Sequence, residues 1–246
     1  MSLRAMGISV LFFAFLAVSL AQQDLNGKVF LFPEQSDSSY VILKPELKNT
    51  LNKLTVCLQY YTSLARDYAL FSLATRGADN AFLIYPTPPN LCYVYVNQED
   101  FLFTIDVQAL DWTHICASWD SGTGEVQLWV NGKLYPRRLC RNKGFVLQSE
   151  TSIILGQDQD TFGGKFSDAQ SFVGEISNVN MWDYVLSADN MRKTVFDRSV
   201  SGTVIGWRSL QYETKGKVSV LPQLQCKFWD KTYISYAQCS DSNTNK

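Results

Sequence analysis

The sequence has little of what most catalytic sites need. It contains a single histidine, His114, among 246 residues. Any Ser-His-Asp or Cys-His enzyme would have to use this residue, yet it lies inside a run of β-forming residues, two positions from Cys116. We therefore interpret His114 as a structural histidine. The phosphate-binding patterns GxGxxG and GxxxxGK[ST] are also absent.

A paired-carboxylate glycosidase is another chemistry found on β-rich folds. It needs two acids that face each other across a cleft. The nearest candidates, Glu175 and Asp183, fall at opposite ends of one predicted strand. The sequence therefore predicts a binding protein that is not an enzyme, with a glycan-processing enzyme on a jelly-roll scaffold as the alternative.

Long apolar runs are scarce as well. One such run, residues 8–18, follows Arg4 and precedes the small residues Ser19 and Ala21. This order is typical of a secretory signal peptide, here residues 1–21, and the run is too short to span a bilayer. We expect cleavage after Ala21, a secreted extracellular chain and no membrane insertion.

Neither sign of charge is in excess. Removal of Arg4 with the signal peptide leaves 21 basic residues against 23 acidic ones. Nucleic acid or an anionic membrane would not be attracted by so weak a field. The sequence therefore predicts no nucleic-acid partner.

Helix signals are also few, whereas short β-forming runs recur about every ten residues. The one helix expected spans about 187–196, with Ser187 as its N-cap, and Asn131-Gly132 marks a two-residue hairpin turn. This pattern predicts an all-β fold, a two-sheet antiparallel β-sandwich or jelly roll. The predicted strands are 29–32, 40–43, 54–60, 69–74, 81–85, 92–96, 101–105, 112–119, 125–130, 152–155 and 172–182.

Six cysteines in a secreted chain are most simply paired as disulfides. Cys57 and Cys116 lie in the middle of two predicted strands, and a bridge between them would stabilise the fold by about 4 kcal/mol. Spacing does not assign the others, Cys92, Cys140, Cys226 and Cys239. Zinc bound by four cysteines is the competing interpretation, but the sequence has no CxxC pair.

An acidic loop, QDQDTFGGKFSD, follows the predicted strand 152–155. It offers oxygen donors from Asp158, Asp160 and Gln170, and its glycines allow the backbone to fold back. Hard oxygen donors of this kind suit calcium. The loop does not fit an EF-hand, because Ala169 stands where a bidentate Glu is required. A second loop must therefore complete the shell.

Several segments resemble the pentraxin family. HICASW, residues 114–119, fits the pentraxin pattern His-x-Cys-x-Ser/Thr-Trp. SIILGQDQDTFGGKF and SFVGEISNVNMWD resemble the calcium loop of that family and the strand that follows it. The resemblance runs in order from about residue 27 to 224, so we expect a pentraxin domain at 22–224 and a tail at 225–246.

The resemblance implies a complete calcium site. Asp79 and Asn80 would join Asp158, the backbone carbonyl of Gln159 and Asp160 around a first ion. A second ion would share Asp158 and Asp160 and add Gln170.

The second ion is expected to bind more weakly. The sequence has Ser167 where the family normally carries a carboxylate, and the loss of a formal charge weakens a site of hard oxygens. Asp168, one residue further on, would point in a different direction.

The same resemblance implies a ligand patch beside the metal. Tyr85 and Tyr95 would hold the alkyl end of phosphocholine or phosphoethanolamine, and Asp100 would face the amine. Plain strand packing is the alternative explanation for Tyr85. The implied function is calcium-dependent pattern recognition in innate immunity, lectin-like and acute-phase, directed at phosphocholine, phosphoethanolamine or anionic glycans. The implied assembly is a homopentameric ring that recruits complement C1q.

The tail has no counterpart in the family pattern. Cys226 and Cys239 would bridge each other or link subunits, and the tail aromatics would pack on a neighbour. Both arrangements remain open at this point. The aromatic residues concerned are Phe228, Trp229, Tyr233 and Tyr236.

Overall fold

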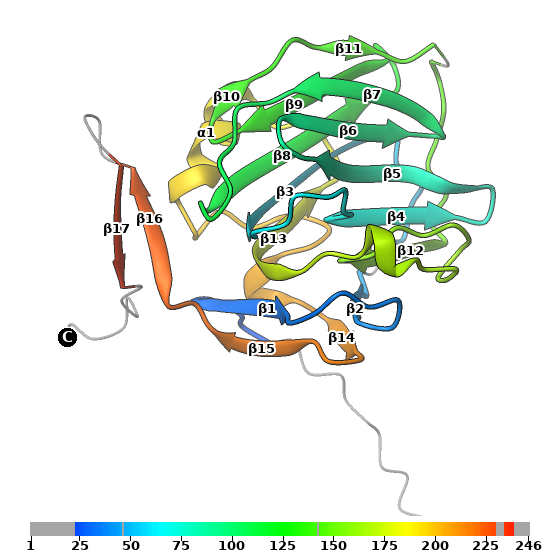
Figure 1. Cartoon of the computed structure of the whole chain (residues 1–246). Coiled ribbons are helices and arrows are strands. Elements are labelled where there is room, and N and C mark those ends of the chain that lie inside the picture. Colours follow the sequence, from blue (N-terminus) through cyan, green and yellow to red (C-terminus); the bar gives the residue numbers. More distant parts are fainter. Residues whose placement is uncertain (1–22, 46, 142, 230–233, 239–246) are drawn as a thin grey trace, which may run out of the picture.

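Two antiparallel sheets pack face to face in the computed structural model (Figure 1). The structure describes residues 23–45, 47–141, 143–229 and 234–238, with the backbone alone for 225–229 and 234–238. Within these residues the fold is a β-sandwich with one α-helix, which confirms the predicted fold class. The predicted signal peptide and Cys239 lie outside the described residues.

The larger sheet has the strand order β10-β9-β8-β3-β13-β1-β15, and β11 also pairs with β9. Its edge strands are therefore β10 and β11 on one side and β15 on the other. The bounds are β1 Lys28–Phe32, β3 Lys53–Tyr61, β8 Thr113–Asp120, β9 Glu125–Val130, β10 Lys133–Leu134, β11 Arg138–Leu139, β13 Gly174–Trp182 and β15 Ser219–Pro222.

The second sheet has the order β14-β2-β12-β4-β5-β6-β7. A separate two-stranded ribbon, β16–β17, stands beside the sandwich in Figure 1. The bounds are β2 Tyr40–Leu43, β4 Phe71–Thr75, β5 Ala78–Thr87, β6 Leu91–Val96, β7 Glu99–Thr104, β12 Thr151–Leu155, β14 Tyr212–Lys215, β16 Gln225–Trp229 and β17 Ile234–Gln238.

The core lies between the two sheets, and alternation along the strands explains it. In β6 every second residue is buried, so Cys92, Val94 and Val96 face inward and the tyrosines between them face outward. Apolar side chains from both sheets fill the space. The largest fully buried ones include Trp119, Phe30, Phe32, Phe71, Phe82 and Phe103.

The helix α1, Ala188–Phe196, begins where the sequence predicted. Ser187 is its N-cap and accepts a hydrogen bond from the Asn190 amide at 3.3 Å. Its buried face, including Met191, packs with the disulfide and Trp129. The helix therefore covers the outer face of the larger sheet.

The Cys57–Cys116 disulfide is confirmed. The two residues are direct partners in the β3–β8 register, so the bridge joins neighbouring strands of one sheet. The expectation that all six cysteines pair is wrong for Cys92 and Cys140, which are buried thiols. Burial raises the pKa of the Cys92 thiol to about 12, so this cysteine acts as a small apolar core residue. The side chain of Cys226 is not described.

The strand predictions hold for the long apolar runs and fail for short polar ones. Asn131 and Gly132 have φ of 50° and 77°, as the predicted hairpin turn requires. β14 and β15 were not predicted, since their sequences YETK and SVLP carry little alternation. β13 begins at Gly174, two residues later than expected.

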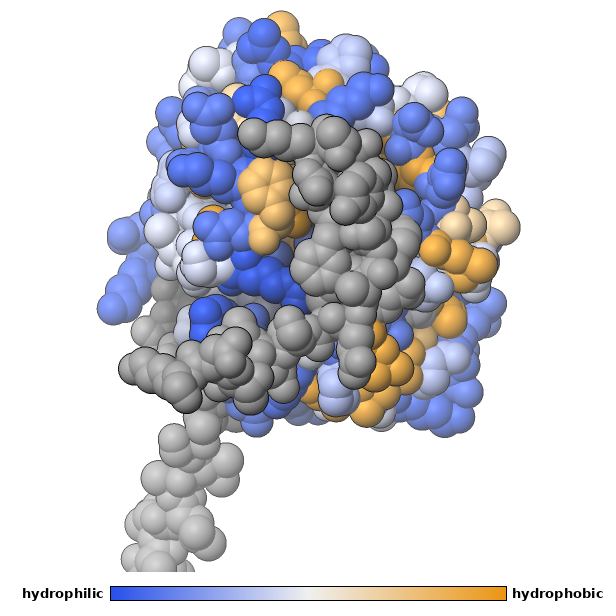
Figure 2. All heavy atoms as spheres, turned by 90° about the vertical axis from the view of Figure 1, so that its left-hand side faces the viewer, coloured by the Kyte–Doolittle hydropathy of each residue, from blue (hydrophilic) through white to orange (hydrophobic). Residues whose placement is uncertain are grey.

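The surface is mostly polar. Figure 2 shows one side of the molecule, where small groups of apolar side chains lie among hydrophilic ones. No helix in the described part of the chain has the length and apolar character needed to cross a bilayer. The exposed large apolar residues are Leu102, Leu110, Leu134, Leu139, Tyr184, Phe196, Leu221 and Leu224.

Candidate metal centre and ligand patch

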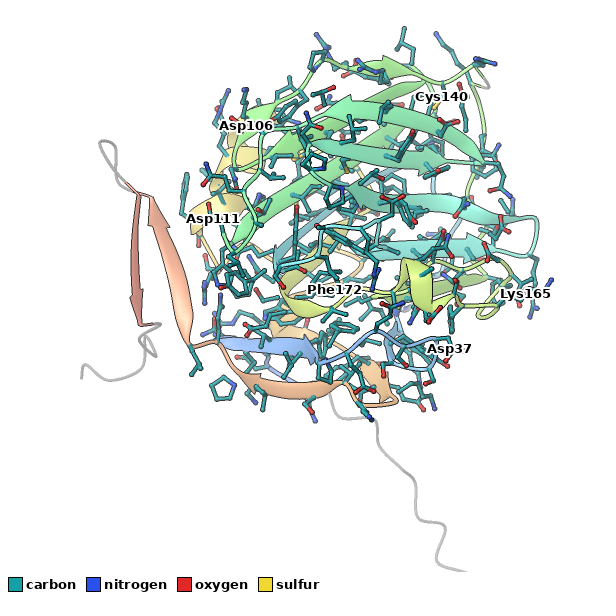
Figure 3. The ribbon with its side chains drawn as sticks, viewed as in Figure 1. Asp37, Asp106, Asp111, Cys140, Lys165 and Phe172 are labelled. Carbon is teal, nitrogen blue, oxygen red and sulfur yellow. A yellow bond between two sulfur atoms is a disulfide. The ribbon has the colours of Figure 1, made fainter. Side chains whose placement is uncertain are left out.

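The acidic loop leaves the sandwich at Gly156 and returns at Phe172. Gly156 has φ of 83°, and a Cβ there would lie 2.3 Å from Cε1 of Phe32, so only glycine fits. The Phe172 amide donates to the Gly156 carbonyl at 2.9 Å and closes the neck of the loop. Figure 3 labels Lys165 on this loop and Phe172 where the chain re-enters the core.

The side chain of Gln159 fixes the first turn of the loop. It is fully buried, and its Nε2 donates to the carbonyls of Ser72 and Ser152 at 3.0 and 3.1 Å. Its Oε1 accepts from the Gly163 amide at 2.9 Å. Because the side chain is used in this way, the backbone carbonyl of Gln159, which the pentraxin resemblance implies as a ligand, is the group it could offer a metal.

The second segment is the start of β5. Oδ1 of Asp79 accepts hydrogen bonds from the Asn80 amide at 2.9 Å and from Nε2 of Gln98 at 2.5 Å. Oε1 of Gln98 in turn accepts from the same Asn80 amide at 3.1 Å. Gln98 therefore orients Asp79 from the turn between β6 and β7. No pattern in the sequence predicts this contact, because it depends on strand pairing.

The structure brings the two segments together. Asp158 is 5% exposed, and its pKa is raised to about 6 by burial and by the nearby carboxylates of Asp160 and Asp79. Oδ2 of Asp158 accepts from Nε2 of Gln170 at 3.2 Å. The carboxylates of Asp79, Asp158 and Asp160 therefore lie close enough to interact electrostatically, although they come from two separate segments.

Two oxygens at this place are buried without a hydrogen-bond partner among the described residues: Oδ1 of Asp158 and Oδ1 of Asn80. Such atoms are rare in folded proteins and call for an explanation such as an ion. Carboxylate, amide and carbonyl oxygens are the donor set that Ca²⁺ prefers. The residues present therefore fit a calcium ion, and their roles as ligands remain a prediction.

A second group of possible metal ligands is explained otherwise. Within the described ranges, Cys57, His114 and Cys116 are the three such side chains whose ligand atoms all lie within 4.8 Å of one another. The two sulfurs form the disulfide, so this group is not a metal site. Asp79, Asp158 and Asp160 do not form a group of this kind, because their carboxylates do not all lie within 4.8 Å of one another.

Asp168 does not replace the missing carboxylate at Ser167. Its Oδ2 accepts from Nε2 of Gln35 at 3.4 Å, so it faces the segment after β1. Ser167 precedes the 3₁₀ turn η1, Asp168–Gln170, without a side-chain cap. Neither contact provides a further carboxylate ligand for a second calcium ion.

Tyr85, Tyr95 and Asp100 lie on the outer face of the second sheet. Tyr95 and Asp100 are direct partners across β6 and β7. The pKa of Tyr85 is raised to about 12 by burial and by the nearby carboxylates of Asp67 and Asp158. The predicted ligand patch is therefore adjacent to the candidate metal centre.

Sequence reasoning missed three residues of this patch. Tyr93 is the direct partner of Tyr85, and Leu102 is the direct partner of Tyr93. Asp67 contributes to the raised pKa of Tyr85. The alternation in β6 would have placed Tyr93 on the same face as Tyr95, whereas the position of Asp67 depends on tertiary packing.

The fold and this site define a β-sandwich recognition protein with an acidic, calcium-compatible loop. The Pentaxin family model matches residues 28–222. The chain is 51% identical to the C-reactive protein of Xenopus laevis, over 93% of this chain and 97% of that protein. It is 43% identical to human C-reactive protein, over 85% and 94%.

A solved structure agrees on the fold. The native heptameric SAP-like pentraxin from Limulus polyphemus superposes with a TM-score of 0.73 at 23% identity, over 80% of this chain and 95% of that one. This chain belongs to the pentraxin family.

Family membership also decides between the two functional classes. Pentraxins are non-enzymatic recognition proteins, so the chain falls in a class of binding proteins. Glu175 opens β13 and Asp183 directly follows its last residue, so the two acids of the enzyme alternative lie at opposite ends of one strand. The glycan-processing alternative is therefore set aside.

Proposed function

We propose that this chain is a secreted, calcium-dependent recognition protein that binds phosphocholine, phosphoethanolamine or anionic glycans on microbes and damaged cells. The observation that supports this proposal is that the carboxylates of Asp79 and Asp160 lie close enough to Asp158 to raise its pKa. The buried oxygens without hydrogen-bond partners at Asp158 and Asn80 support it further.

The first calcium ion would be held by Asp79, Asn80, Asp158, the Gln159 carbonyl and Asp160. A second, weaker ion would share Asp158 and Asp160 and add Gln170, for which the contact of Gln170 with Asp158 gives support. When bound, calcium supplies positive charge at the surface, to which a phosphate or carboxylate oxygen of a ligand binds.

The aromatic patch would hold the other end of such a ligand. Tyr85 and Tyr95 present partly exposed rings beside the metal loop, and Asp100 is exposed on the neighbouring strand. A protonated amine would be attracted by the carboxylate of Asp100 and by the ring faces. The site would therefore select ligands by the distance between their phosphate and their amine.

The chain would act as a cyclic homo-oligomer, as a pentamer by family analogy. Leu134 is 40% exposed on one edge strand of the larger sheet, and Leu221 is 43% exposed on the other. Two different apolar edges suit a head-to-tail contact that closes into a ring. A ring multiplies weak sites into avidity for repetitive surfaces. Recruitment of complement C1q is proposed from family membership alone.

The proposal includes the processing of the chain. Residues 1–21 would be removed as a signal peptide, residues 22–224 would form the recognition domain, and 225–246 a tail with two cysteines. The β16–β17 ribbon, which forms a sheet of its own, supports a separate tail.

Chelation tests this function directly. The purified protein should bind a phosphoethanolamine column in calcium and elute in EDTA, and it should hydrolyse no glycan. An Asp158→Asn variant should pass through the column in both conditions. Retention that is equal in calcium and in EDTA would refute the proposed function.

A further inference from the structure

Four side chains form one continuous surface on the outer face of β5, β6 and β7. We call it the tyrosine shelf: Tyr85, Tyr93, Tyr95 and Leu102. Tyr93 stands at its centre, as the direct partner of Tyr85 on one side and of Leu102 on the other. The rings of Tyr93 and Tyr95 are neighbours on this face, with centroids 6.0 Å apart and planes inclined by 33°.

The two ends of the shelf differ in their surroundings. Tyr85 lies close to Asp158 of the metal loop, and Tyr95 lies opposite Asp100. Tyr93 is one strand further from the metal loop than Tyr85, and Leu102 is two strands further. Neighbouring strands are about 4.8 Å apart, which is close to the width of one sugar ring. A group that contacts Tyr93 is therefore about one sugar ring beyond a group that contacts Tyr85.

The chemistry of the shelf favours one kind of occupant. Phenol rings offer flat apolar faces with a polar hydroxyl at the edge, which matches a pyranose ring with one apolar face and a rim of hydroxyls. An acyl chain prefers an enclosed aliphatic groove. Leu102, 39% exposed, is the one aliphatic member of the shelf, so the surface is open and mostly aromatic.

We propose that Tyr93 and Leu102 form a second subsite, which stacks against a pyranose ring adjacent to an anionic group held at the metal centre. The ligand class is an acidic or phosphorylated glycan of at least two sugars. This inference rests on the proposed function, because the metal centre anchors the first sugar. A glycan of two sugars would contact Tyr93, whereas a small phosphorylated amine would end at Asp100 and would not reach Tyr93.

Tyr93→Ser removes the central ring and keeps a hydroxyl on the exposed face. A matched control is Tyr184→Ser, because Tyr184 is 44% exposed and is the second residue after β13 of the other sheet. Three probes are titrated by calorimetry in excess calcium. They are phosphoethanolamine, mannose 6-phosphate, and a disaccharide in which the same phosphorylated mannose is linked to a second mannose.

The unmodified chain should bind the disaccharide about two- to tenfold more tightly than mannose 6-phosphate, the gain expected of one aromatic contact. Tyr93→Ser should bind both sugars equally and leave phosphoethanolamine unchanged. Tyr184→Ser should behave as the unmodified chain. Circular dichroism of each variant shows whether the sandwich is retained, and Tyr93→Phe, which keeps the ring, should retain the disaccharide gain.

Two results would overturn the subsite. One is an unchanged disaccharide gain in Tyr93→Ser. The other is a loss of phosphoethanolamine binding in Tyr93→Ser, which would place Tyr93 in the site for small phosphorylated amines. If phosphoethanolamine binds and the disaccharide shows no gain in the unmodified chain, the subsite alone is refuted. If no phosphorylated probe binds in the presence of calcium, both the subsite and the proposed function are refuted.

Discussion

The buried histidine makes stability depend on pH in a calculable way. His114 is 3% exposed, and its Nδ1 has no hydrogen-bond partner in the part of the chain that the structure describes. Burial lowers the pKa of His114 to about 4. In the unfolded chain the pKa returns to about 6.5. Between these values the unfolded chain binds more protons, so stability falls as the pH drops through this window.

The size of the effect follows from the two pKa values. Between pH 7 and pH 5 the linkage of this one group removes about 2 kcal/mol of folding free energy. Asp158 acts in the opposite direction, because its folded pKa is raised to about 6 and its ordinary value is near 4. The folded chain therefore binds more protons there, and acidification from pH 7 to pH 5 returns about 1 kcal/mol. The contributions of His114 and Asp158 have opposite signs, so the total free energy of unfolding shows neither of them separately.

Comparison with a variant that lacks His114 separates the two contributions. Urea unfolding of the unmodified chain and of His114→Gln is measured at pH 7 and pH 5, at one protein concentration and in EDTA. Asp158 is present in both chains and cancels in the difference. We expect the stability of the unmodified chain relative to the variant to fall by about 2 kcal/mol between pH 7 and pH 5. A difference that does not change with pH would refute a buried neutral histidine.

Four further predictions follow from the described contacts. Replacement of Cys57 and Cys116 by alanine should lower the unfolding free energy by about 4 kcal/mol in chemical denaturation, and an unchanged midpoint would contradict this. Gln98→Ala should weaken calcium binding about 10- to 100-fold in calorimetry, with no change of melting temperature in EDTA, since it orients a ligand. Tyr95→Thr should shift preference from phosphoethanolamine towards phosphocholine, and an unchanged ratio would favour a packing role. Ser167→Asp should strengthen the second calcium step by about tenfold, and equal steps already present in the unmodified chain would disprove the weak second site.

The sequence predicted those features that depend on local pattern. Alternation identified the strands that form the core, and Ser187 marked the start of α1, because both signals reside in neighbouring residues. The motif HICASW, together with the acidic loop, pointed to the family. The sequence pattern did not predict β14 and β15, because edge strands that are only partly buried need little apolar alternation.

Tertiary contacts explain what the sequence did not show. Gln98 reaches Asp79 because two turns meet at one end of the second sheet, and no spacing in the chain records this. The pairing of Tyr85 with Tyr93 depends likewise on the register of β5 and β6. Cys92 is a free thiol in the core, although the sequence predicted a disulfide, because the spacing of cysteines along the chain does not show which sulfurs lie together.

A crystal structure grown in excess calcium tests the central claim most directly. We expect a metal ion with oxygen ligands from both segments, Asp79 or Asn80 on one side and Asp158 or Asp160 on the other, at about 2.3–2.6 Å. An ion held by one segment alone, or no ion between Asp79 and Asp158 at saturating calcium, would contradict the account.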